Sequence, residues 1–244
     1  MRLLTAKAIK DCDLEEWKKD ALYTFEEKME NTEKPFPCIP ATQGHALDHF
    51  RYGFVAELRK ESSANNLAQL LTEYSQVYRT IGNYTSLIVF YETSSQLLSV
   101  KQYEQEFWGQ LNNITEMDLK DWPSHIPVDP HDSLWEFCFH GEQYFMFCGT
   151  PAHQNRQSRY FPYFMLAITP RLVLENFHSS PIHANKIKSK IRKRLKNYDS
   201  IPIHPDLNTY GKQDNYEWKQ YFLHDDDTTL SKCPFHRFIN KFKK

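Results

Sequence analysis

Residues 135–148, with the sequence WEFCFHGEQYFMFC, decide the fold class. Two apolar runs rich in aromatic residues, 135–139 and 144–148, flank the polar tetrapeptide 140–143, which contains Gly141. Two strand-forming runs joined by a short segment with a glycine are typical of a β-hairpin. We therefore predict two adjacent antiparallel strands in this part of the chain.

The segments around this hairpin predict helices first and further strands later. Apolar residues recur at helical spacing in four segments, the last of them strongly basic: 14–30, 63–81, 99–111 and 182–196. Short apolar runs predict three more strands: 51–58, 86–91 and 163–168. Helices and strands do not alternate as βαβ repeats along the whole chain. We therefore expect an α+β fold with a mixed, largely antiparallel sheet and helices packed on it.

Length, charge and cysteine content place the chain in a broad class. Its 244 residues are enough for a full hydrophobic core. We expect a single large domain over 1–244, with an N-terminal helix in 1–34 and a loop-rich C-terminal segment over 198–244. The net charge of −1 gives no long-range attraction to nucleic acid or acidic membranes, so we expect neither partner. Five widely spaced cysteines without a C-x-x-C pair, and no N-terminal apolar run like a signal peptide, favour a cytoplasmic protein.

The segment 35–55, PFPCIPATQGHALDHFRYGFV, holds the first candidate site. It brings the Cys38 thiol, the imidazoles of His45 and His49 and the Arg51 guanidinium into one short stretch. Such groups ligate iron or zinc, or bind an anionic cofactor. On a helix, histidines four residues apart lie on one face, as in zinc proteases. The glutamate that supplies the general base in those enzymes is replaced here by alanine, which weakens the hydrolase interpretation.

Two further segments are candidates for binding. The polar loop 150–159 contains His153 and two arginines, which can bind carboxylates or phosphates. Residues 186–196 and 241–244 are the basic clusters, and the first has isoleucine or leucine at every fourth position, typical of an amphipathic helix with a solvated basic face. The chain contains no glycine-rich phosphate-binding motif, so nucleotide-dependent chemistry is disfavoured.

A series of short motifs occurs in order along the chain. The motifs are PFPC at 35–38, RYGFV at 51–55, FCFHGE at 137–142, TPAH at 150–153, SR at 158–159, PR at 170–171, YG at 210–211, EWKQYF at 217–222 and CPF at 233–235. The series resembles the YqcI/YcgG family, and the resemblance extends over almost the whole chain.

The resemblance implies haem chemistry. Members of that family with an assigned role are haem-dependent N-oxygenases, so it implies haem, O2, an electron donor and a small-molecule substrate. The implied reaction is hydroxylation of a guanidino or amino nitrogen of a small, polar, arginine-like compound. An imidazole is the expected axial ligand of the haem iron: His49 first, His45 next and His153 third. A Cys38 thiolate is the less favoured variant.

The resemblance also suggests charged partners for cofactor and substrate. Four arginines are candidates to pair with haem propionates or a substrate carboxylate: Arg51, Arg156, Arg159 and Arg171. Glu142, at the predicted hairpin turn, is a candidate acceptor for a substrate guanidinium.

Two other functions compete with this interpretation. The first is a non-haem metal enzyme that uses His45, His49 and a carboxylate such as Asp48 or Glu142. The second is a binding module without enzymatic activity, which would use the basic helix 186–196 against nucleic acid or a protein partner.

Overall fold

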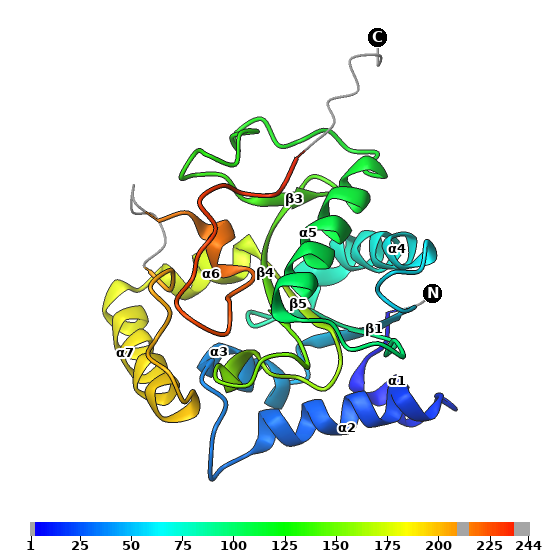
Figure 1. Cartoon of the computed structure of the whole chain (residues 1–244), viewed down its shortest axis with the longest axis horizontal. Coiled ribbons are helices and arrows are strands. Elements are labelled where there is room, and N and C mark those ends of the chain that lie inside the picture. Colours follow the sequence, from blue (N-terminus) through cyan, green and yellow to red (C-terminus); the bar gives the residue numbers. More distant parts are fainter. Residues whose placement is uncertain (1–2, 209–214, 237–244) are drawn as a thin grey trace.

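A five-stranded mixed sheet forms the centre of the protein, in a computed structural model that describes residues 3–208 and 215–236 (Figure 1). Its strand order is β1-β2-β5-β4-β3. β1 and β2 are parallel, and every other neighbouring pair is antiparallel. The strands are β1 Phe50–Val55, β2 Ser86–Tyr91, β3 Phe137–Phe139, β4 Glu142–Gly149 and β5 Met165–Pro170. The predicted α+β class with a largely antiparallel sheet is confirmed.

Helices and short 3-10 turns surround this sheet. The helices are α1 Ala6–Lys10, α2 Glu16–Glu30, α3 Ile39–Ala46, α4 Ser62–Val77, α5 Val100–Glu116, α6 Arg171–His178 and α7 Pro181–Tyr198. The 3-10 turns are η1 Tyr78–Thr80, η2 Gln157–Arg159 and η3 Glu217–Gln220. The four helices expected from apolar spacing correspond to α2, to α4 with η1, to α5 and to α7. None of the helices in the described ranges combines the length and apolar character needed to cross a membrane.

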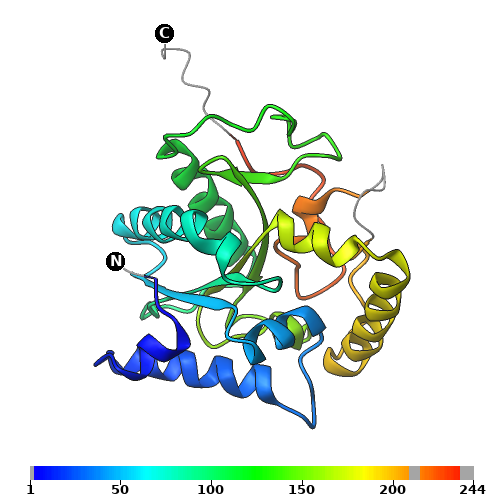
Figure 2. The ribbon, with the colours of Figure 1, turned by 180° about the vertical axis from the view of Figure 1, so that it is seen from behind.

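The two faces of the sheet are buried against different helices (Figures 1 and 2). Successive side chains of a strand point to opposite faces, so the completely buried β2 contributes to both sides. Leu87 and Val89 pack into a cluster with α4 and α5. Ile88 and Phe90 pack into a second cluster with α2. The helices α6 and α7, yellow in Figure 1, contact each other, and α6 also contacts β4 and β5.

The β3–β4 hairpin is tighter than the sequence suggests. We expected the four residues 140–143 in the turn, but Phe139 pairs with Glu142, so that only His140 and Gly141 lie between the strands. Both have positive φ, 54° and 78°. That conformation matches the twist of a two-residue hairpin turn and is easiest for glycine. β3 is correspondingly short and begins at Phe137, not at residue 135.

Three helices were not predicted, and one strand was predicted too long. α3 forms where we expected a proline-rich loop, because Pro40 lies in its first turn, where proline needs no hydrogen bond. α1 and α6 are short and were not assigned at all. The strand expected over 51–58 ends at Val55.

Candidate functional site

An apolar cavity of about 290 Å³ lies on the face of the sheet that α2 covers. Alternate residues of neighbouring strands form its floor, as the two-residue period of a strand requires. The floor residues are Ser86, Ile88, Phe145, Phe147, Met165, Ala167 and Thr169. Side chains of α2, α3, α6 and α7 form the walls. A concave site with a mostly apolar lining and few polar groups is typical of a small-molecule or cofactor site.

The cavity lining includes the imidazole of His178, the last residue of α6. Its Nδ1 lies 2.7 Å from the carbonyl oxygen of Leu174, one turn earlier in the helix. A carbonyl only accepts hydrogen bonds, so Nδ1 carries the proton and Nε2 has a lone pair. Nε2 is buried and has no hydrogen-bond partner within the described parts of the chain. Burial lowers the pKa of His178, which favours the neutral form of the ring.

An unsatisfied buried nitrogen is costly for a folded protein. A buried polar atom without a partner destabilises the native state by about 1–3 kcal/mol. The described ranges hold several such atoms, and His178 Nε2 is the one that belongs to a residue of the cavity lining. A ligand or ion that satisfies a buried polar atom is one explanation for its retention. His178 Nε2 therefore marks the cavity as a place where a bound group is expected.

Two lysines add positive charge to the cavity lining. The Lys28 amine donates to the carbonyl oxygens of Gln157 and Tyr160, at 3.2 and 2.8 Å, and burial lowers the pKa of Lys28 to about 8. Lys188, on α7, makes no hydrogen bond or ion pair with the residues that the structure describes. Burial, followed by repulsion from Arg192, lowers the pKa of Lys188. An anionic group bound at the cavity would counteract the lowering of the pKa of both lysines.

Cys38 is the predicted ligand that does line the cavity. It precedes the first residue of α3. Burial raises the pKa of the Cys38 thiol, although a hydrogen bond with the Ala41 backbone and the charges of Arg159 and Arg194 oppose this rise. The thiol is therefore neutral, and a thiolate here would require a bound cation to hold it.

His45 and His49 do not form the predicted pair on one helix face. α3 ends at Ala46, and Asp48 has a left-handed φ of 55°, so His49 lies beyond the helix. His45 Nε2 lies 3.0 Å from a Glu30 carboxylate oxygen. The His49 ring stacks on Tyr84, which lines the cavity, while His49 itself does not. No group of three potential ligands among His, Cys, Asp and Glu occurs in the described ranges.

His153 is a buried structural residue away from the cavity. Its Nδ1 lies 2.8 Å from the Thr150 hydroxyl, and its Nε2 lies 2.8 Å from the Leu223 carbonyl oxygen. Both ring nitrogens are therefore used inside the protein, which does not favour His153 as an iron ligand. Burial lowers the pKa of His153 to about 4.

The lowered pKa of His153 predicts that the protein loses part of its free energy of unfolding in acid. Its folded-state pKa lies below the ordinary value of 6.5, so its contribution is present above pH 6.5 and is lost as the pH falls towards 4. The free energy of unfolding, measured with urea, should fall between pH 7 and about pH 4.5 in both proteins. The fall should be smaller in His153→Gln than in the wild type, by on the order of 2 kcal/mol. Equal losses in the two proteins would contradict this assignment.

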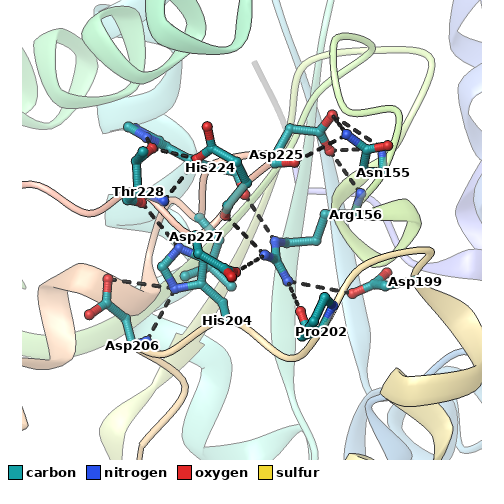
Figure 3. A network of polar contacts seen from close by, with 12 residues as sticks. Asn155, Arg156, Asp199, Pro202, His204, Asp206, His224, Asp225, Asp227 and Thr228 are labelled. Atoms are coloured by element: carbon teal, nitrogen blue, oxygen red, sulfur yellow. Dashed lines mark hydrogen bonds and ion pairs between the residues drawn. The ribbon is translucent and has the colours of Figure 1, made fainter.

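Arg156 connects the loop 150–159 to the C-terminal half of the chain (Figure 3). Its guanidinium is buried, donates to three backbone carbonyls and lies 3.9 Å from the Asp199 carboxylate. The Asp225 carboxylate accepts backbone N–H groups of residues 154–156 from the other side. The three carbonyls belong to Pro202, His224 and Asp226, at 3.1, 2.9 and 3.0 Å. The network holds the loop 150–159 against later segments of the chain, and Arg156 does not line the cavity.

Arg159 and Arg171 have internal roles of the same kind. The Arg159 guanidinium lies 4.1 Å from the ring centroid of Phe147 and donates to the carbonyl oxygens of Tyr221 and Gln220. Arg171 begins α6 and bridges two buried carboxylates. These are Glu136, 2.6 Å from Nε, and Glu217, which bonds to Nη2. Neither arginine lines the cavity.

Glu142 and Arg51 also lie apart from the cavity. The Glu142 carboxylate binds a guanidinium of its own chain, that of Arg79, through two bonds of 2.7 and 2.8 Å. It accepts a third bond, of 2.6 Å, from Tyr78. Arg51 donates to the Phe50 carbonyl at 2.7 Å. The structure thus does not bring the predicted charged residues together around one ligand.

The chain belongs to the YqcI/YcgG family, whose model matches residues 25–236. It is 46% identical over 231 residues to the "Uncharacterized protein YqcI" of Bacillus subtilis (strain 168), covering 93% of this chain and 91% of that protein. It is 43% identical to the "Uncharacterized protein YcgG" of the same organism, covering 95% and 93%.

One relative has a name that describes an activity. The chain is 30% identical over 240 residues to the "Putative N(omega)-hydroxy-L-arginine synthase DcsA" of Streptomyces lavendulae, covering 96% of this chain and 89% of that protein. No solved structure matches the chain. The family resemblance inferred from the motifs is therefore confirmed.

Proposed function

We propose that this protein is a haem-dependent N-hydroxylase that acts on a guanidino or amino nitrogen of a small polar substrate. The relative DcsA supports the reaction type, because its name describes hydroxylation of a guanidino nitrogen. The cavity supports the cofactor. The observation that carries the proposal is a buried imidazole nitrogen without a partner in the lining of an otherwise apolar cavity.

The residues around the cavity fit the three chemical parts of haem. The apolar floor suits the face of the macrocycle, and a neutral imidazole nitrogen suits the iron. The amines of Lys28 and Lys188 suit the propionate carboxylates. When bound, haem supplies the activation of O2 with electrons from an external donor, while the protein supplies binding, orientation and exclusion of water.

The lining also suits the chemistry of the substrate nitrogen. Among the described residues that line the cavity there is no aspartate or glutamate. An amine held there meets no carboxylate from the lining and is poorly solvated, and both effects lower its pKa. This favours the neutral amine, whose nitrogen has the lone pair that hydroxylation requires. The predicted role of Glu142 as the guanidinium acceptor is not needed in this arrangement.

A spectrum and a product assay test this proposal. Purified full-length protein supplied with haem should develop a Soret band and retain it through gel filtration. With O2, a reductant and L-arginine or a related guanidine or amine, it should form a product that contains one additional oxygen atom on nitrogen, detected by mass spectrometry. A protein that shows no Soret band after incubation with excess haem and gel filtration would contradict the proposal.

A further inference from the structure

We infer that His178 is the axial ligand of the haem iron, in place of His49, His45 or His153. This inference rests on the proposed function, because it names the residue through which this chain would hold the cofactor. It comes from three independent observations: the position of His178 in the cavity lining, the hydrogen bond at its Nδ1 and the unpartnered state of its Nε2.

The hydrogen bond at Nδ1 prepares the ring for ligation. A metal-bound histidine almost always donates its second ring N–H to a carbonyl or carboxylate, which fixes the tautomer and makes the ligating nitrogen more basic. Leu174 O provides this acceptor at 2.7 Å. Leu174 and Phe177 of the same helix also line the cavity, so the α6 backbone holds the imidazole next to an apolar surface.

The other histidines lack this combination. His45 and His49 each have a buried Nδ1 without a partner in the described ranges, but neither ring lines the cavity. His153 uses both of its nitrogens. Cys38 lines the cavity, but it is a half-buried thiol whose pKa is raised, which disfavours the thiolate. His178 therefore combines a neutral nitrogen, a fixed tautomer and a place at the cavity.

Lys188 is a second residue of the proposed site, with a role that can be tested separately from that of His178. It lies on α7, lines the same cavity and acts on His178 through its charge. In the inferred arrangement its amine binds a propionate and does not touch the iron. Its loss should therefore weaken haem binding without changing the ligand field of the iron, which separates it from His178.

The test compares the iron spectra of haem-loaded variants of the full chain. His178→Gly should lower haem affinity by more than the roughly 10–100-fold that the loss of an outer-shell partner costs. It should also lose the histidine signature in magnetic circular dichroism and resonance Raman spectra. Added imidazole should restore that signature in His178→Gly. Lys188→Ala should bind haem more weakly with an unchanged signature, and Lys188→Arg should restore affinity.

Control variants and a fold check make the outcomes decisive. His45→Ala and His49→Ala should keep the wild-type spectra, and far-UV circular dichroism should show that each variant is folded. His178→Gln provides a polar replacement of similar size if the glycine variant does not fold. A haem-loaded wild type whose signature survives in His178→Gln would overturn the ligand assignment alone. A wild type that binds no haem would overturn the proposed function and this assignment with it.

Discussion

Replacing Arg171 with methionine should lower the free energy of unfolding by about 3–5 kcal/mol, the effect expected when one partner of a buried ion pair is removed. Arg171 bonds to Glu136 and Glu217, and all three side chains are at most 4% exposed. Methionine keeps much of the volume but supplies no charge. Chemical denaturation of the wild type and the variant at neutral pH measures the difference.

The exposed pair Arg79–Glu142 is the matched control for this prediction. Here too a guanidinium makes two short bonds to carboxylate oxygens, both of Glu142, but the Arg79 side chain is 56% exposed. Solvent-exposed ion pairs contribute about 0–1 kcal/mol. Arg79→Met should therefore cost much less than Arg171→Met, and equal costs would show that burial of the Arg171 group does not determine its contribution.

The pH dependence of Arg171→Met provides an independent measurement. Burial raises the pKa of Glu217 to about 7, and Arg171 opposes this rise. For a carboxyl whose folded-state pKa is raised, the stability contribution is full below its ordinary pKa and is lost as pH rises through 7. Without Arg171 the pKa of Glu217 should rise further. The deficit of the variant should therefore be larger at about pH 8 than at about pH 5, and a deficit independent of pH would contradict this.

The parts of the fold that sequence could predict are those with strong local signals. The strand 86–91 coincides with β2, because a short continuous apolar run fits a strand buried on both faces. Ser99 was predicted to begin a helix, and it does cap α5, together with Gln102 in a reciprocal capping box. The short helices α3 and α6 lack such signals. Helices of eight residues depend on tertiary packing more than on their own propensity.

The candidate site was harder to predict, because residue type does not reveal the environment of a residue. Arg156, Arg159 and Arg171 were selected as cations that could bind a carboxylate, yet each is committed to internal partners. His178 was missed because α6 was not predicted. The contact of His178 with Leu174, one helical turn earlier, can be predicted only if a helix is predicted there. The burial of Nε2 arises from segments distant in the chain, and no spacing encodes it.

The central position of Ala167 in the cavity floor leads to the second prediction. It pairs with Ile88 on one side and with Phe147 on the other, and both of these also line the cavity. Ala167→Phe should place an aromatic ring in the space that we assign to haem. Relieving that overlap costs about 1–3 kcal/mol, so haem affinity should fall by about 5- to 150-fold. Titration of the purified variant with haem measures this loss.

The stability of Ala167→Phe distinguishes a blocked cavity from a damaged fold. Filling an existing cavity commonly raises stability by about 0.5–2 kcal/mol, whereas overpacking a full core lowers it. We expect the variant to unfold at the same or a higher denaturant concentration than the wild type while it binds haem more weakly. Ala167→Ser, which changes the volume little, should retain haem binding. If Ala167→Phe binds haem as tightly as the wild type, the cofactor does not occupy this cavity, and the assignment of Lys188 and His178 to it would be wrong as well.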